Sequence, residues 1–153
     1  MKSRSADPNC RTRYDEALQE ALKKKPDLER AAHLLQEAHD EGDSRASYAL
    51  ATWYLHGKHY RRNLREALRL LREAAKSGVP DALYDLAVCY EEPVGVPENL
   101  PLAAELYVRA ALAGHAQSTY EVGRCYYYGV GVEKDRRIAR VWLDRAQRLG
   151  VTN

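Results

Sequence analysis

The sequence lacks several residues and patterns that would point to other classes of protein. Its 153 residues include no phenylalanine, one methionine, one isoleucine and three cysteines. No apolar run approaches the roughly 18 residues that a membrane-spanning helix needs. Glycine and proline, at 9 and 6 residues, are far below the share typical of low-complexity chains. These absences argue against membrane-spanning, collagen-like and disordered classes.

The cysteines are too few and too scattered for a disulfide framework. Cys10, Cys89 and Cys125 are odd in number and form no CxxC pair, which also argues against a zinc site. Cys89 and Cys125 lie 36 residues apart and are expected to be small core residues. The first ten residues, MKSRSADPNC, have no apolar segment after their basic residues and so do not form a signal peptide. We therefore expect a cytoplasmic protein.

Alanine and leucine dominate the apolar part of the chain. The sequence has 22 alanines and 19 leucines against 10 valines. Straight-chain helix formers therefore far outnumber β-branched residues, which favours helices throughout. With 45% hydrophobic and 30% charged residues, the composition fits one globular domain.

A repeat of 36 residues runs through the chain. Three columns of residues recur at this interval. They are the glycines Gly42, Gly78, Gly114 and Gly150, the alanines Ala31, Ala67, Ala103 and Ala139, and the Asp or Asn residues Asp27, Asn63, Asn99 and Asp135. Asp and Asn side chains accept hydrogen bonds at helix starts, and glycine follows helix ends. Each unit therefore contains one capped amphipathic helix.

A second type of helix precedes each of the three later caps. Its apolar residues fall at the spacing of Ala46, Leu50, Ala51 and Tyr54, which places all four on one helical stripe. The third of these positions is always small, as in Ala51, Ala87 and Gly123, so two helices can approach closely there. Each unit is therefore predicted to be a helical hairpin.

We expect eight helices, over residues 9–24, 27–41, 44–56, 63–77, 80–91, 99–113, 116–128 and 135–149. They form one domain, 1–153, made of a first hairpin at 9–41 and repeats at 44–78, 80–114 and 116–150. Hairpins that cannot bury their apolar faces alone stack on one another. The predicted fold is all-α, a right-handed superhelix, or solenoid, of about four hairpins.

Over about residues 27–150, the chain resembles the Sel-one-like repeat family, a relative of the tetratricopeptide repeat. The stretches that carry this resemblance are ASYALATWYLHG, ALYDLAVCYEE and STYEVGRCYYYGVGVEKDRRIARVWLDRAQRLG. The first full loop, GKHYRRN, lacks the family's second glycine, and the second loop has Pro93 in place of the first glycine. These two loops are expected to differ in shape from the family's.

No pattern of a known catalytic or cofactor site is present. The sequence has no HExxH, GxSxG or P-loop, and GVGVEK at 129–134 lacks the third glycine and the preceding strand of a dinucleotide site. His56 and His59 are interpreted as solvated loop residues rather than metal ligands, because no cysteine or acidic partner is nearby. We predict a protein that is not an enzyme and has no catalytic residues, metal or cofactor.

In such a solenoid, the first helix of each hairpin lines the concave surface, where a partner would bind. The residues predicted there are Tyr48, Thr52, Leu55, Asp81, Tyr84, Asp85, Val88, Glu91, Tyr120, Arg124, Tyr127 and Tyr128. Tyr48, Tyr84 and Tyr120 lie 36 residues apart, and we expect them to support the contact between neighbouring hairpins rather than to contact a ligand. In the run 126–128, three consecutive helical residues cannot all face the core, so at least one ring should be exposed.

Charge alternates in bands along the chain. Residues 46–78 hold seven basic and two acidic residues, whereas 79–114 hold one basic and six acidic residues. Acidic side chains near the groove, Asp81, Asp85, Glu91 and Glu92, predict a basic partner. The bands also allow self-association between molecules.

Two helices carry rows of basic residues. The row on 63–77 includes Arg65, Arg69 and Arg72, and is interpreted as a solvated face rather than a nucleic-acid site. The last helix is also rich in arginine, with Arg136 where other units have leucine, and is predicted to be a polar cap.

The leading interpretation is a non-enzymatic scaffold or adaptor that binds a partner protein or peptide on its concave face, with no nucleic acid or membrane involved. The alternative is an inhibitor or immunity-type protein that neutralises a bacterial toxin or enzyme. A hydrolase is less favoured than either.

Overall fold

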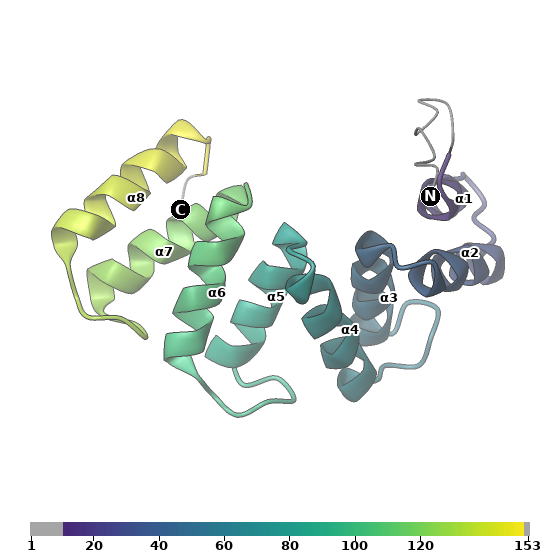
Figure 1. Cartoon of the computed structure of the whole chain (residues 1–153), viewed down its shortest axis with the longest axis horizontal. Helices are drawn as coiled ribbons and strands as arrows, with labels where there is room; N and C mark the ends of the chain where they lie inside the picture. The colour runs from purple at the N-terminus through teal and green to yellow at the C-terminus, as the bar shows by residue number, and fades with distance from the viewer. Residues whose placement is uncertain (1–10, 152–153) are drawn as a thin grey trace, which may run out of the picture.

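The computed structural model describes residues 11–151, and this range contains eight helices and no strand (Figure 1). In chain order they are α1 (Arg13–Ala21), α2 (Leu28–Asp40), α3 (Ser44–His56), α4 (Leu64–Lys76), α5 (Pro80–Glu91), α6 (Leu100–Leu112), α7 (Ala116–Tyr128) and α8 (Arg136–Arg148). The predicted all-α class is confirmed.

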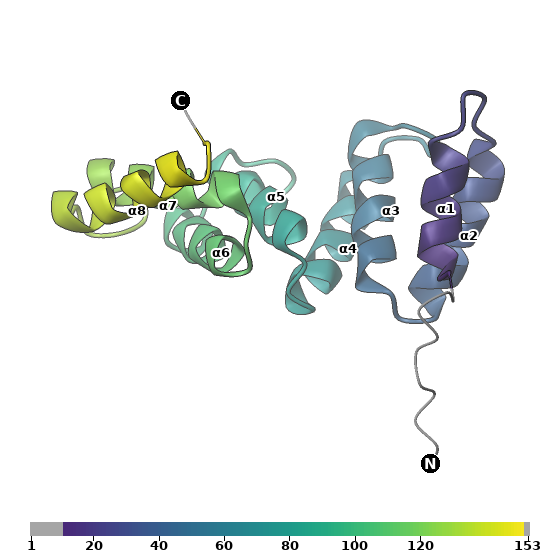
Figure 2. The same ribbon diagram turned by 90° about the horizontal axis from the view of Figure 1, so that it is seen from above.

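The helices pair in sequence order and the pairs stack. The hairpins are α1–α2, α3–α4, α5–α6 and α7–α8, and each hairpin packs on the next through α2–α3, α4–α5 and α6–α7. They follow one another along an arc, with α1 and α8 at its two ends (Figure 1). From above, α7 and α8 run at a steep angle to α1 and α2, as a superhelix requires (Figure 2). This arrangement is the predicted solenoid.

The Asp or Asn column and the glycine column of the repeat lie at the helix ends, as predicted. The side chains of Asp27, Asn63, Asn99 and Asp135 each accept a hydrogen bond from a backbone N–H in the first turn of the following helix. Gly42, Gly78, Gly114 and Gly150, just past the ends of α2, α4, α6 and α8, have φ angles of 89°, 81°, 97° and 77°. This left-handed conformation costs glycine little, which explains why the column is invariant within the chain.

The three later hairpins close with the same backbone hydrogen bond. The cap residue donates its N–H to the carbonyl of a tyrosine, over 2.9 Å from Asn63 to Tyr54 and from Asn99 to Tyr90, and over 3.0 Å from Asp135 to Tyr126. This bond does not depend on the sequence of the loop that it closes.

The loops themselves differ. Gly95 and Gly131 have φ angles of 72° and 69°, whereas His59, at the same point of the first full loop, does not have a positive φ. A Cβ atom at Gly131 would lie 2.0 Å from the carbonyl oxygen of Leu100. The last loop is therefore pressed against the start of α6, and only glycine fits there. The first full loop therefore differs from the last at this point of the backbone.

The first helix is shorter than predicted. The prediction over 9–24 was wrong, because Arg11 and Thr12 precede α1 and Leu22 ends it. The Thr12 side chain accepts from the N–H of Asp15 while the Asp15 carboxylate accepts from the N–H of Thr12, a capping box that fixes the start. At the other end, Pro26 disfavours helical geometry for the residue before it. Residues 9 and 10, including Cys10, lie outside the described range.

Small residues let the two helices of a hairpin approach closely. Ala51 and Ala87 are fully buried, and a Cβ atom added to Gly123 would lie only 2.7 Å from Cγ and Cδ2 of Leu143 on α8. Cys89 and Cys125 are buried free thiols, as predicted. The core is thus a row of small side chains flanked by leucines.

We predict that Gly123→Ala destabilises the protein, even though alanine gains about 1 kcal/mol over glycine in helix propensity. Overpacking against Leu143 should cost about 1–3 kcal/mol, measured by urea unfolding followed by circular dichroism. The same substitution in a Leu143→Ala background, where the obstructing side chain is gone, should be neutral or stabilising. If Gly123→Ala stabilises both backgrounds equally, the close approach of α7 and α8 is refuted.

Candidate protein-interaction surface

A groove lies between α5 and α7, with Tyr107 of α6 at its base. Its volume is about 310 Å³. We define the α5–α7 groove by its lining residues, Tyr84, Val88, Glu91, Glu92, Tyr107, Glu121 and Arg124. Four of these residues, Tyr84, Val88, Glu91 and Arg124, belong to the surface predicted from the sequence.

A smaller pocket of about 180 Å³ adjoins this groove and shares Arg124 with it. We call it the tyrosine pocket; it is lined by Tyr120, Arg124, Tyr127, Tyr128 and Leu143. Tyr128 is 67% exposed and Tyr127 is 36% exposed. The prediction that at least one ring of the 126–128 run is exposed is therefore confirmed.

Arg124 ties the groove together. Its Nη2 lies 2.6 and 2.8 Å from the two carboxylate oxygens of Glu91, and its Nε donates to Glu121 over 2.7 Å. Glu91 also accepts a hydrogen bond of 2.8 Å from the hydroxyl of Tyr107, a buried residue. This network joins α5, α6 and α7, so it fixes the third hairpin against the fourth.

The hydrogen bonds of the network keep Arg124 and Tyr107 protonated. Burial opposes the charge of Arg124, but hydrogen bonds to Glu121 and Glu91 outweigh it and raise the pKa of the guanidinium above its usual value. Burial, together with the bond to Glu91, raises the pKa of Tyr107. Arg124 stays cationic and Tyr107 stays a hydrogen-bond donor across the physiological pH range.

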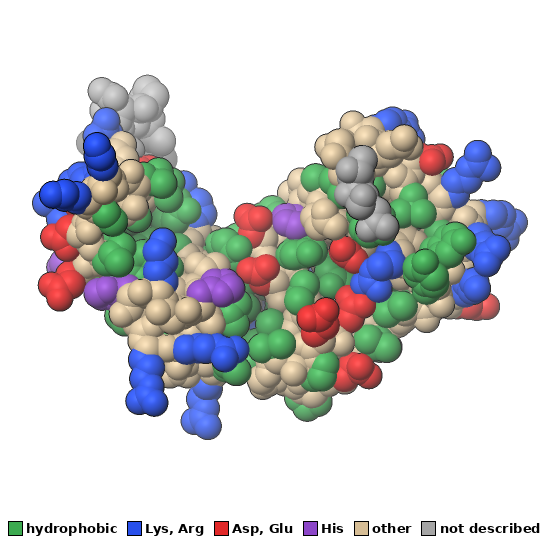
Figure 3. All heavy atoms as spheres, turned by 180° about the vertical axis from the view of Figure 1, so that it is seen from behind, with side chains coloured by type: hydrophobic (Ala, Val, Ile, Leu, Met, Phe, Trp, Pro, Cys, Tyr) green, Lys and Arg blue, Asp and Glu red, His purple; other side chains and the backbone are tan. Residues whose placement is uncertain are grey.

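The surface remains strongly acidic despite Arg124. Together, α5, the following residue Glu92, and α7 carry five carboxylates and one arginine, a formal balance of −4. Acidic side chains gather near the middle of the face shown in Figure 3, with basic side chains toward its two ends. A cationic segment would be attracted to the middle of this face.

Two of the repeated tyrosines support the stacking of hairpins. The hydroxyl of Tyr48 donates to Asp85 over 3.1 Å, from α3 to α5. The ring of Tyr84 stacks on His115 with centroids 4.5 Å apart. Tyr120, in contrast, lines the tyrosine pocket. The repeated position thus serves hairpin contact in two repeats and an open surface in the last.

His115 caps α7 and also reaches α5. Its Nδ1 accepts from the backbone N–H of Ser118 over 3.2 Å, which places the ring proton on Nε2, 3.5 Å from the Asp81 carboxylate. Burial raises the pKa of Asp85, one turn further along α5. Asp81 and Asp85 therefore take part in contacts between hairpins.

Five predicted residues, Tyr48, Thr52, Leu55, Asp81 and Asp85, do not line the groove or the tyrosine pocket. The Thr52 hydroxyl bonds the carbonyl of Ala49 over 2.8 Å, and Leu55 is half-buried. Conversely, sequence reasoning missed Tyr107, Glu121 and Leu143. Glu121 carried a readable signal, since it lies three residues before Arg124 on one helix.

Other charged features have local roles. Arg69 pairs with Glu66 and Glu73 on α4. The His59 ring contacts Trp53 and Tyr60.

Within residues 11–151, no group of three or more His, Cys, Asp or Glu side chains could hold a metal ion. None of the helices in this range is long and apolar enough to cross a membrane.

Comparison with known proteins identifies the repeat. The Sel1 repeat matches this chain four times, at residues 17–43, 44–79, 80–115 and 116–151. The chain belongs to the Sel1 repeat family. The first match begins within α1, earlier than the resemblance in the sequence indicated. Sel1 repeats are protein-interaction modules, and proteins built from them are typically non-enzymatic scaffolds.

Solved structures agree with this assignment. A Sel1 repeat protein from Oxalobacter formigenes is 38% identical, with a TM-score of 0.76 over 80% of this chain and 92% of that one. The protective antigen c5321 of uropathogenic Escherichia coli is 26% identical, with a TM-score of 0.85 over 91% of this chain and 30% of that one.

A third structure shares the fold at lower identity. The immunity protein Pa5087 from Pseudomonas aeruginosa is 23% identical, with a TM-score of 0.63 over 90% of this chain and 52% of that one. At this identity the likeness shows the fold alone. No curated protein matches the chain.

We predict that Glu91→Ala and Glu92→Ala differ sharply in stability, although the two residues are adjacent. Glu91→Ala leaves the buried hydroxyl of Tyr107 without its acceptor and should cost about 1–3 kcal/mol. Glu92→Ala removes an exposed carboxylate and should change stability by less than about 0.5 kcal/mol. Urea unfolding measures both, and equal effects would contradict the assigned network.

The buried thiols should be unreactive in the folded protein. Burial raises the pKa of Cys125 to about 11, and burial also raises the pKa of Cys89. In a Cys10→Ser variant, we expect Ellman's reagent at pH 8 to detect almost no thiol until denaturant is added, and then two per chain. Rapid reaction of the folded protein would show that one of these cysteines is accessible.

Proposed function

We propose that this protein is a non-enzymatic scaffold that binds a basic segment of another protein in the α5–α7 groove and the adjoining tyrosine pocket. The observation that carries the proposal is that the acidic groove and the pocket with exposed aromatic rings adjoin on consecutive hairpins. Neither feature alone would specify both the charge and the apolar character of a partner.

The chemistry of the surface supports this assignment. Tyrosine provides a large and fairly rigid contact area with a polar end, which suits a binding surface. Because Arg124 is engaged by Glu91 and Glu121, the exposed carboxylate of Glu92 remains in the groove for a partner. An arginine or lysine beside an apolar residue would match the groove and the pocket together.

An inhibitor or immunity-type role would use the same surface, with a toxin or enzyme as the partner. Its support from comparison is the fold shared with immunity proteins of Pseudomonas aeruginosa at 23% identity. The identity of the bound protein separates a scaffold from an inhibitor, because an inhibitor must abolish the activity of what it binds.

The test compares three forms of the protein as bait in the cells of origin. The groove variant, Glu92→Lys with Tyr128→Ala, changes two exposed side chains of the proposed surface. The control variant, Arg61→Glu with Arg65→Glu, changes two exposed side chains before and on α4. We expect the wild type and the control to capture the same protein, and the groove variant to lose it.

Binding of the purified partner should then weaken more than tenfold in the groove variant, because each 1.4 kcal/mol is about tenfold in affinity and a buried tyrosine anchor contributes about 2 kcal/mol or more. Calorimetry at low and high salt measures this, and affinity should fall as salt rises. A partner that binds the groove variant at full affinity, or binding that is lost only in the control variant, would overturn the proposal.

A further inference from the structure

The last helix has an exposed surface that is both basic and apolar. It carries five arginines and one aspartate, a formal balance of +4. Val141 is 66% exposed and Ile138 is 40% exposed. Only Ala139 and Ala146 of α8 are fully buried. Helix α8 therefore offers most of its circumference to a partner.

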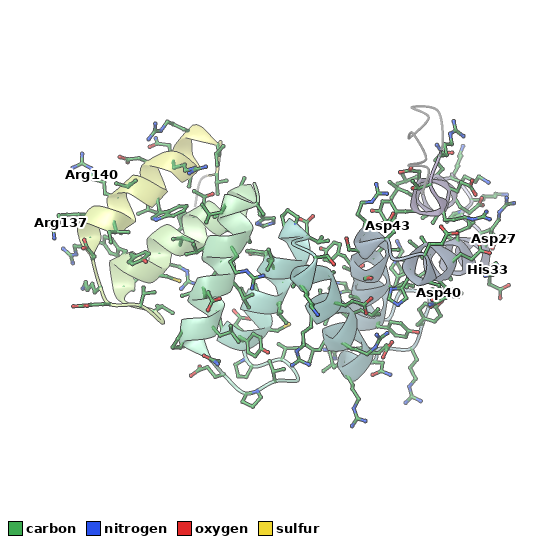
Figure 4. The ribbon with its side chains drawn as sticks, in the orientation of Figure 1. Asp27, His33, Asp40, Asp43, Arg137 and Arg140 are labelled. Atoms are coloured by element: carbon green, nitrogen blue, oxygen red, sulfur yellow. The ribbon has the colours of Figure 1, made fainter. Side chains whose placement is uncertain are left out.

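Two arginines of α8 are weakly held within the molecule. The side chains of Arg137 and Arg140 are 95% and 84% exposed, and their ion pairs with Asp135 and Asp144 are long, at 3.8 and 4.0 Å. Exposed pairs of this kind contribute little. Both side chains extend away from α8 at one end of the arc (Figure 4). They are free to pair with carboxylates of another molecule.

The side of α8 that would face a further hairpin is polar, whereas the same side of the equivalent helices α4 and α6 is apolar. Arg136 stands one and two repeats after Leu100 and Leu64, and Arg140 stands after Ala104 and Leu68. Leu68 and Ala104 are buried by the next hairpin, whereas both arginines are exposed. The apolar contact used between hairpins is therefore unavailable on this side of α8, and a charged partner suits it better.

The α5–α7 groove has the complementary character. Its helices, with Glu92, balance to −4 against +4 on α8, and the exposed ring of Tyr128 matches the exposed side chain of Val141. A basic segment with an apolar side, the kind of partner proposed for the groove, is thus present in the chain itself as α8. A helix cannot reach the groove of its own molecule while it packs on α7, so the contact must join two molecules.

We propose that α8 of one molecule docks in the α5–α7 groove of a second copy of this chain. The contact is heterologous, because the two molecules use different surfaces, and each dimer still offers one free groove and one free α8. The inference rests on the proposed function of the groove. It adds that a groove occupied by α8 of another copy cannot hold the partner protein at the same time.

The experiment measures the mass of the full chain by sedimentation velocity over a wide range of concentration at low and high salt. Three variants accompany the wild type: the groove variant, the control variant on the α4 side, and a tail variant, Arg137→Glu with Arg140→Glu. We expect the mass of the wild type and the control to rise with concentration and to fall with salt. Both the groove variant and the tail variant should remain monomeric.

Mixing the groove variant with the tail variant provides the decisive arm. The tail variant keeps an intact groove and the groove variant keeps an intact α8, so the mixture should form a one-to-one dimer that grows no further. A wild type that stays monomeric at every concentration overturns the inference. A groove variant that still self-associates overturns it as well, because the contact would then not use the groove.

Failure here is distinguishable from failure of the proposed function. If the wild type is monomeric while the groove variant loses its captured partner, only the inference about a second copy is wrong. If the molecules associate as described but the captured partner is indifferent to the groove variant, the groove serves self-association, and the proposed partner site is wrong.

Discussion

The close approach of two helices within each hairpin is the constraint on which the rest of this structure depends. It requires a side chain no larger than a methyl group at the centre of the first helix, filled by Ala51, Ala87 and Gly123. Since interiors are packed nearly as densely as crystals, a larger residue there would push the helices apart. The distance between helices then sets where the tyrosine one turn later, and the loop after it, can lie.

Contacts between hairpins are partly polar, and some of them use side chains that also line the binding surface. Tyr48 bonds Asp85, Tyr84 stacks on His115, and Arg124 joins Glu91. Glu91 thus both helps to hold the stack together and contributes negative charge to the groove. Because solenoid stability is a sum of neighbour terms, changing the recognition chemistry of one repeat also changes how firmly it holds the next.

Much of the fold could be read from the sequence, because periodicity and capping are local signals repeated four times. The predictions of a helix start at Asn63 and a helix end before Gly78 are each supported by an equivalent residue one repeat away. The first hairpin lacks such counterparts at its start, and the length of its first helix was misjudged. The capping box of Thr12 and Asp15 occurs once in the chain, and without a repeated counterpart it is easily overlooked in the sequence.

The candidate site was only partly predictable for a different reason. Helical spacing indicates which side of its own helix a residue occupies, but not which side chain of another helix it meets. Tyr107 stands where another repeat has Leu71, and spacing alone suggests one more core residue. Its bond to Glu91 depends on how α6 packs on α5. Asp85 and Glu91 share one helix, yet only Glu91 lines the groove.

The shared backbone bond that closes each hairpin has a consequence for how this protein can diversify. Because the bond between Asn63 and Tyr54 forms without a left-handed residue at His59, the loop after α3 closes without the glycine that the last loop requires. Its exposed last residues accept insertions with little loss. The segment after α7 offers no such freedom, since Gly131 is wedged against Leu100. New binding specificity could thus be grafted after α3 but not after α7.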